Sequence, residues 1–165
     1  MPRAGIALGS NLGDRMANLA EAIRMLGEIA INNEPFLQAP VYQTEPLLCP
    51  PNSPDFLNTV VEFSFNGTAA ELLGETRAIE KSMGRMNNPQ RNAPRVIDVD
   101  ILYFGNEQCQ STVLILPHPR LHERRFVLQP LADIRPELVL AGQAKCIALM
   151  LEELKSDEAP LVAIR

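Results

Sequence analysis

The stretch 91–102 reads Arg-Asn-Ala-Pro-Arg-Val-Ile-Asp-Val-Asp-Ile-Leu and changes character half-way along. Its second half alternates apolar and acidic residues, which is typical of a β-strand because successive strand side chains point to opposite faces. The alternation places Asp98 and Asp100 on one face, roughly 6.6 Å apart along the chain. Acidic residues are poor strand formers, so two of them in an otherwise apolar strand indicate a role beyond packing.

The charges around this strand predict a phosphate and metal site. Two carboxylates at this spacing can hold hard divalent cations, which prefer oxygen ligands. The segment 81–95 has no acidic residue and carries four cations, Lys81, Arg85, Arg91 and Arg95. Phosphoryl transfer needs this combination, because its catalysis depends on positioning and charge neutralisation. The alternative interpretation of the Asp-x-Asp pair is a solvated strand face.

Length and composition predict a single domain over residues 1–165, long enough to bury a sizeable core. The hydrophobic fraction of 46% and charged fraction of 21% are ordinary for a globular protein. The net charge of −5 argues against general binding of nucleic acid or anionic membranes. Three widely spaced cysteines fit neither a zinc nor a disulfide pattern, and the sequence shows no signal-peptide or membrane-spanning pattern. We therefore expect a cytoplasmic protein.

Hydrophobic periodicity predicts an alternating set of strands and helices. Strands are expected at 4–8, 38–43, 56–65, 97–102 and 113–116, and helices at about 16–30, 68–83 and 144–154. Asp14 can cap the first helix, and Thr68 and Glu71 form a capping box before the second. The first six elements follow the order of ferredoxin-like folds. We expect an α+β fold, with a ferredoxin-like βαββαβ core, an antiparallel-rich sheet, helices packed on it and C-terminal additions.

Three loops and one strand position are candidates for binding. The proline-rich loop 44–54 is either an edge linker or a binding loop. The polar loop 85–94 is long enough to be a functional lid, and we expect it to be mobile until a nucleotide binds. The segment 117–126 collects both histidines and three arginines, so it is a solvated basic loop or an anion site, whereas zinc is disfavoured. Asn58 is either a solvated amide or a bidentate partner for a heterocycle edge.

The pattern at 91–102 resembles the signature of the 6-hydroxymethyl-7,8-dihydropterin pyrophosphokinases, enzymes of folate biosynthesis. This pattern of twelve residues is long and irregular, so a chance match is improbable. Other segments also resemble this family: Gly-Ser-Asn-Leu-Gly at 9–13, Asp-Phe-Leu-Asn at 55–58, and Pro-His at 117–118 followed by Arg-Arg-Phe at 124–126. The resemblance covers nearly the whole chain.

The resemblance implies transfer of the β,γ-diphosphate of ATP to the 6-hydroxymethyl group of 6-hydroxymethyl-7,8-dihydropterin, with release of AMP. It implies that Asp98 and Asp100 bind two Mg²⁺ ions that bridge the phosphates. Arg85 and Arg95 would stabilise transition-state charge. The implied ATP-binding residues are Arg91, Arg95, His118 and Arg124. The implied pterin-binding residues are Thr44, Leu47, Phe56, Asn58 and Phe126.

This chain departs from well-known members of the family in the loop 85–94. Asn87 stands where they carry an arginine and Asn92 where they carry an aromatic residue, so fewer loop cations and a different closure are expected. Two other functions remain open. A magnesium-dependent nucleotidyltransferase or nuclease could use the same acid pair, and a non-catalytic ferredoxin-like binding module would show no magnesium-dependent ATP turnover. We expect a monomer that binds small-molecule substrates, no nucleic acid and no membrane, and is too short to include a fused folate enzyme.

Overall fold

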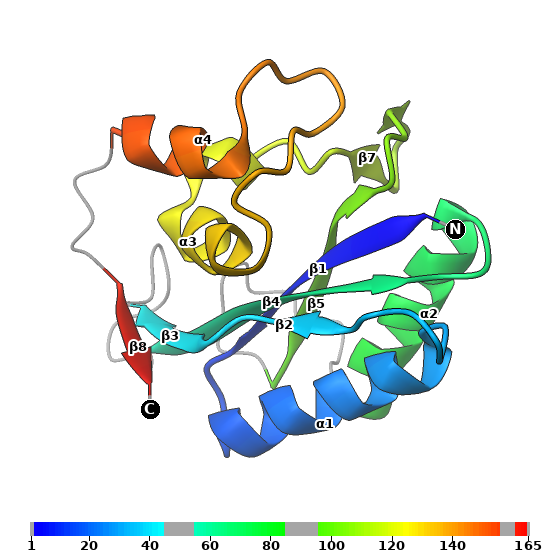
Figure 1. Cartoon of the computed structure of the whole chain (residues 1–165). Coiled ribbons are helices and arrows are strands. Elements are labelled where there is room, and N and C mark those ends of the chain that lie inside the picture. Colours follow the sequence, from blue (N-terminus) through cyan, green and yellow to red (C-terminus); the bar gives the residue numbers. More distant parts are fainter. Residues whose placement is uncertain (1, 45–54, 85–95, 156–160, 165) are drawn as a thin grey trace.

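A six-stranded antiparallel sheet forms the centre of this computed structural model, which describes residues 2–44, 55–84, 96–155 and 161–164 (Figure 1). Its strands are β1 (Arg3–Ser10), β2 (Leu37–Gln38), β3 (Val41–Thr44), β4 (Phe56–Ser64), β5 (Asp98–Phe104) and β8 (Val162–Ile164). The helices are α1 (Arg15–Ile29), α2 (Ala69–Ser82), α3 (Arg125–Ile134) and α4 (Ile147–Glu153), with a short 3-10 helix, η1 (Leu121–Glu123). Strands β6 (Cys109–Gln110) and β7 (Ile115–Leu116) form a separate ribbon.

The topology confirms the predicted ferredoxin-like core. Strands β1, β3, β4 and β5 alternate with α1 and α2 in the order βαββαβ, and they lie side by side in the order β5-β1-β4-β3. Each pair of neighbours is antiparallel. Helices α3 and α4 and strand β8 are the C-terminal additions, and β8 extends the sheet beyond β3. The predicted caps are present: Asp14 accepts from the Ala17 N–H at 3.1 Å, and Thr68 and Glu71 form the capping box.

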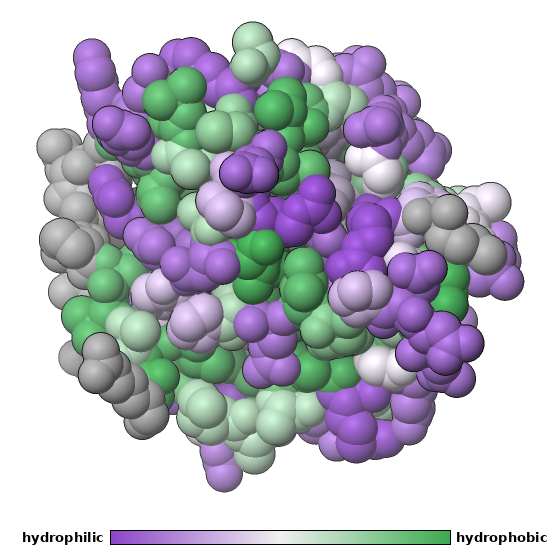
Figure 2. Space-filling view, in the orientation of Figure 1, coloured by the Kyte–Doolittle hydropathy of each residue, from purple (hydrophilic) through white to green (hydrophobic). Residues whose placement is uncertain are grey.

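The sheet separates two hydrophobic cores (Figure 1). Helices α1 and α2 cover one face, where alternate residues of the central strands are buried, among them Ile6, Leu8, Val61 and Phe63. Helix α3 covers the other face and α4 packs on α3, around Val60, Leu128, Leu131 and Ile147. Hydrophilic side chains are interspersed among the hydrophobic ones on the surface over α3 and α4 (Figure 2). The strand predicted over residues 56–65 contributes to both cores, because its successive side chains point to opposite faces of the sheet.

The strand predicted over residues 38–43 is interrupted. Its residues belong to β2 and β3, which are separated at Ala39 and Pro40. Proline has no N–H to donate to a strand ladder, so a continuous strand across Pro40 is disfavoured. The Ala39 N–H still donates to the Val60 carbonyl at 3.0 Å and keeps the segment beside β4.

Helix α3 was not predicted from the periodicity. Pro130 lies inside it, and a proline in a helix interior costs about 3 kcal/mol. Its buried apolar residues include Val127, Leu128 and Leu131, each contributing about 1.5–3 kcal/mol. Burial against the sheet therefore exceeds the cost of the proline, and only the tertiary structure reveals this.

Strand β5 contains a β-bulge at Leu102. The register pairs Tyr103 with Gly5 and Ile101 with Ile6, so Leu102 is an extra residue. A bulge interrupts the alternation of faces. As a result, Leu102 and Tyr103 both belong to the core on the α3 side of the sheet.

Candidate active site

The candidate site lies on the α3 side of the sheet, at the end where β1 finishes. The register pairs Tyr42 with Asn58, Asn58 with Gly9, and Gly9 with Asp98. Directly paired residues of antiparallel strands point to the same face. These positions therefore form a row across β3, β4, β1 and β5, and Asp100 lies two residues along on the same face. The predicted sharing of one face by the two aspartates is confirmed.

Gly9 leaves the middle of this row without a side chain. A Cβ atom added at Gly9 would lie 2.8 Å from Oδ1 of Asn58 and 3.6 Å from Cδ1 of Phe56. The shorter distance is a clash, so glycine is needed here for close approach rather than for backbone conformation. The side chains of β4 can therefore lie over β1.

Asn58 is held in place by Thr44. Its side chain is buried, with 7% of the residue exposed, and its Nδ2 donates to Oγ1 of Thr44 at 2.7 Å. Thr44 pairs in turn with Phe56 in the β3–β4 register. The interpretation of Asn58 as a solvated amide is therefore wrong. Thr44, Phe56 and Asn58 lie together, whereas Leu47 lies outside the described residues.

Arg124 and Phe126 enter the site from the start of α3. The Arg124 guanidinium carbon is 5.5 Å from the centre of the Phe126 ring, a cation–π distance. Burial and the neighbouring Arg120 lower the pKa of Arg124, while Asp100 and Asp98 act in the opposite direction. The guanidinium therefore lies within electrostatic reach of both aspartates and remains charged near neutral pH.

His118 is oriented by the backbone around it. The backbone N–H of His118 donates to the Leu102 carbonyl at 2.8 Å, and the ring Nδ1 accepts from the backbone N–H of Arg120 at 3.2 Å. With Nδ1 as acceptor, the proton of a neutral imidazole is on Nε2. Burial, followed by the charges of Arg124 and Arg120, lowers the pKa of His118. The ring is therefore neutral at neutral pH and presents Nε2–H as a donor.

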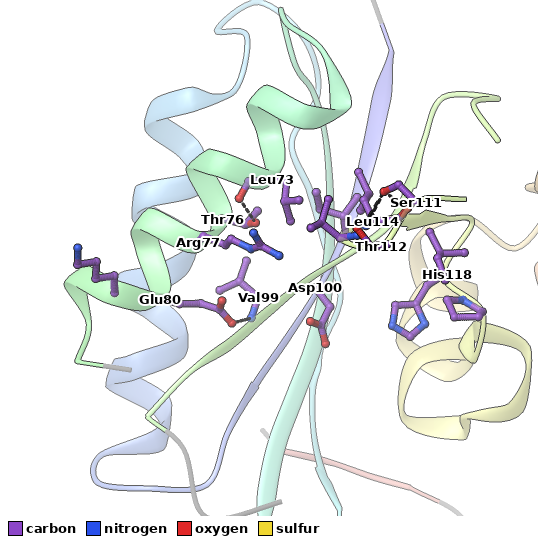
Figure 3. Close-up of a pocket in the computed structure, with 15 residues that line it drawn as sticks. Leu73, Thr76, Arg77, Glu80, Val99, Asp100, Ser111, Thr112, Leu114 and His118 are labelled. Atoms are coloured by element: carbon purple, nitrogen blue, oxygen red, sulfur yellow. Dashed lines mark hydrogen bonds between the residues drawn. The ribbon is translucent and has the colours of Figure 1, made fainter. Parts of the chain in front are cut away.

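An open cavity of about 1070 Å³ lies beside β5, between α2, the segment 111–115 and His118 (Figure 3). Asp100 lies between α2 on one side and His118 on the other. From α2, Arg77 and Glu80 line the wall, and Glu80 Oε2 accepts from the Val99 N–H at 3.0 Å. Because β5 is at the sheet edge, this N–H needs a partner from outside the sheet.

The sequence interpretation missed this wall of the cavity. Neither Glu80 nor Arg77 was among the predicted site residues. Arg77 and Glu80 are three residues apart on a helix, so they share a face. Their spacing was a usable signal, but their position beside the acidic strand depends on the sheet order.

The remaining predicted site residues lie outside the described residues. These are Arg85, Arg91 and Arg95, and the predicted mobile loop 85–94 falls there too. Within the described ranges, three or more His, Cys, Asp or Glu residues do not gather into a group that could hold a metal ion. The two aspartates match Mg²⁺, which usually takes one or two carboxylates together with water and substrate phosphates.

Residues 5–136 match the family model of the 7,8-dihydro-6-hydroxymethylpterin-pyrophosphokinases (HPPK). The chain belongs to this family. The 2-amino-4-hydroxy-6-hydroxymethyldihydropteridine pyrophosphokinase of Bacillus subtilis is 41% identical over 131 residues, which are 79% of this chain and 77% of that protein. The enzyme of the same name from Haemophilus influenzae is 36% identical over 140 residues, 85% of this chain and 86% of that protein.

Longer proteins also contain an HPPK-like part. The folate synthesis bifunctional protein of Arabidopsis thaliana is 42% identical over 129 residues, which are 78% of this chain and 26% of that protein. The chain thus spans about a quarter of the length of the plant relatives it matches. The crystal structure of Plasmodium falciparum HPPK-DHPS with pteroate superposes with a TM-score of 0.70 over 92% of this chain and 42% of that chain, at 15% identity. This likeness confirms the α+β fold.

Proposed function

We propose that this HPPK-family chain transfers the β,γ-diphosphate of ATP to 6-hydroxymethyl-7,8-dihydropterin, giving the pterin diphosphate and AMP in folate biosynthesis. The observation that carries the proposal is the row in which Asn58, Gly9 and Asp98 are paired. An amide that can bind a heterocycle edge and an acid that can serve the reacting hydroxyl lie on one sheet face, two strands apart. That separation is roughly 9.6 Å, which a bicyclic ring with a hydroxymethyl arm can span.

The pterin would bind over Gly9. Asn58, fixed by Thr44, would hydrogen-bond the polar edge of the ring, and Phe56 and Phe126 would stack on its faces. Leu47 completes the proposed pocket. Stacking supplies affinity, while a buried amide supplies selectivity because a wrong ring leaves it unpaired. Phe56 has no hydroxyl, so it contributes through its ring face.

ATP would bind in the cavity beside β5. Asp100 and His118 are both in its lining, so phosphates bound there lie next to the acid pair. His118 Nε2–H and the Arg124 guanidinium would hold phosphate oxygens together with Arg91 and Arg95, and Arg85 and Arg95 would stabilise transition-state charge. The exposed Val113 and Ile115 give the cavity an apolar wall suited to a base.

Asp98 and Asp100 are the proposed ligands of two Mg²⁺ ions. The two carboxylates share a face and lie near the cavity that would hold ATP, as the usual ligand set of Mg²⁺ requires. Bound Mg²⁺ would neutralise charge on the phosphates during transfer. Asp98, which is in the same row as Asn58, lies on the pterin side and is positioned to accept the proton of the hydroxymethyl group.

We infer a single-domain, cytoplasmic monomer that acts on small molecules and binds neither nucleic acid nor membranes. Among the described residues, the helices all lack the length or apolar character needed to cross a membrane.

The test is a product assay with ATP, Mg²⁺ and 6-hydroxymethyl-7,8-dihydropterin. We expect AMP to form only when pterin is present, and to disappear in Asp98→Ala but not in Glu28→Ala, an exposed acid on α1. ADP would instead indicate transfer of a single phosphoryl group. Pyrophosphate release with a nucleic acid would favour a nucleotidyltransferase. A protein that binds neither ATP nor pterin in a calorimeter would be a binding module.

A further inference from the structure

Helix α3 is joined to β3 by a hydrogen-bonded chain of side chains. The Tyr42 hydroxyl donates to Oδ2 of Asp133, and Oδ1 of Asp133 accepts from Nε2 of Gln129 at 3.2 Å. Tyr42 is buried, with 7% of the residue exposed, whereas Asp133 is exposed, so the hydroxyl reaches a carboxylate at the protein surface through a part-buried contact. Asp133 therefore bridges its own helix and the sheet.

Tyr42, the first residue of this hydrogen-bonded series, lies directly beside the proposed pterin site. Tyr42 is paired with Asn58 in the β3–β4 register, two residues before Thr44 on the same strand face. Asp133 is seven residues, or about two turns, after Phe126, so the two side chains lie on the same side of α3. The contact thus links the sheet residues below the proposed ring to the helix that supplies the aromatic residue above it.

A directional contact here has an effect that packing alone does not have. The apolar contacts of α3 with Val60 and its neighbours hold the helix against the sheet, but apolar burial is non-directional. A hydrogen bond to a carboxylate restricts both distance and angle. Burial, and then the Asp133 contact, raises the pKa of Tyr42 to about 12, so the hydroxyl remains a donor at physiological pH.

We infer that Tyr42 is a positioning residue for the pterin site, which it serves through Asp133 by fixing α3 over β3 and β4. Its effect is to set the gap between Phe56 and Phe126 in which the ring stacks. The inference rests on the proposed function, since it concerns the same site. Tyr42 itself need not touch the substrate.

The test compares the affinities for pterin and for ATP in Tyr42→Phe, which removes the hydroxyl and keeps the ring. Calorimetry uses the oxidised, less reactive 6-hydroxymethylpterin for one substrate and Mg²⁺–ATP for the other. We expect the Kd for the pterin to rise about tenfold, and the Kd for ATP to stay within about twofold. The KM for dihydropterin should rise with it, while kcat at saturation changes less.

Two controls separate positioning from general stability. Tyr103→Phe also removes a tyrosine hydroxyl that donates to a carboxylate, that of Glu62, in a buried contact on the same sheet face but away from the site. It should lower the thermal midpoint and leave the pterin Kd unchanged. Asp133→Asn keeps an acceptor and should retain most of the affinity, whereas Asp133→Leu should reproduce Tyr42→Phe.

The inference is overturned if Tyr42→Phe binds pterin within about twofold of the wild type, or loses both affinities equally. It is also overturned if Tyr103→Phe weakens pterin binding as much. Should Tyr42→Phe fail to fold, the Asp133 pair answers the same question. Wild-type binding is measured first: no pterin binding there refutes the proposed function and with it the inference, whereas wild-type binding with unaffected variants refutes the inference alone.

Discussion

Glu62 should be one of the most sensitive positions for stability, although it lies away from the site. Its carboxylate is fully buried on β4. It accepts from Nε of Arg3 at 2.9 Å, from Nη1 of Arg135 at 2.6 and 2.8 Å, and from the Tyr103 hydroxyl. These donors come from β1, from β5 and from the residue that ends α3, so a single acid holds three elements together on the α3 side of the sheet.

The size of the effect follows from what Glu62→Gln leaves behind. Removing one partner of a buried ion pair costs about 3–5 kcal/mol. The Arg3 and Arg135 side chains keep 24% and 34% of their surface exposed, so water partly replaces the lost carboxylate. We therefore expect the lower end, about 3 kcal/mol. For a chain of this length each ~1 kcal/mol lowers the thermal midpoint by about 2–4 °C, which predicts a drop of about 6–12 °C.

Differential scanning calorimetry of Glu62→Gln and the wild type measures this drop, and urea unfolding checks the free energy independently. The matched control is Glu21→Gln, which removes an exposed acid from its pair with Arg24 on α1 and should leave the midpoint unchanged. A drop of less than about 2 °C for Glu62→Gln would refute the reasoning. It would mean that the contacts of the Glu62 carboxylate stabilise the folded state by no more free energy than burying its charge costs.

Three further outcomes are expected. The free energy of unfolding should fall as the pH drops below about 6.5, because the pKa of His118 is lowered in the folded state and the unfolded chain binds the proton more readily. In thermal melts at a series of pH values, His118→Asn should reduce the fall of the midpoint over this range. Gly9→Ala should weaken pterin binding in calorimetry about tenfold, since the new Cβ lies 2.8 Å from Oδ1 of Asn58. Thr68→Ala should cost about 1 kcal/mol in urea unfolding through loss of the capping box, with kcat unchanged.

The sheet was predictable because alternation is a local property. The patterns around Asp98 and Asn58 determine which residues share a face before any partner strand is known, and the register agrees with them. Caps such as Asp14 are local too. Pro40 was also a readable signal, since a missing N–H interrupts a strand wherever it pairs.

The packing of helix α3 on the sheet face that carries Asn58 and Asp98 was not predictable in the same way. Helix α3 contains Pro130 and is stabilised by burial that exists only once the sheet has formed. The contact between Tyr42 and Asp133 joins residues 91 positions apart, and spacing along the chain carries no information about it. Alternation put Glu62 on the same face as Asn58, but whether that face meets water or α3 depends on the tertiary structure. The role of Glu80 likewise requires knowing that β5 is an edge strand.

At both ends of the α3 side of the sheet, a glycine of β1 lies between larger residues of β4 and β5. Glu62 and Tyr103 are the neighbours of Gly5 on β4 and β5, just as Asn58 and Asp98 are the neighbours of Gly9. Over Gly5, the outer residues meet directly, because the Tyr103 hydroxyl donates to Glu62.

Over Gly9, the amide nitrogen of Asn58 turns away from β5 to Thr44 on β3. A glycine in β1 thus allows side chains of the flanking strands to lie over the sheet centre in both rows. In one row they form an internal hydrogen bond that stabilises the fold. In the other row, the proposed pterin ring would occupy the corresponding space between Asn58 and Asp98. The bound ring would then bridge β4 and β5, as the hydrogen bond between Tyr103 and Glu62 does at the opposite end.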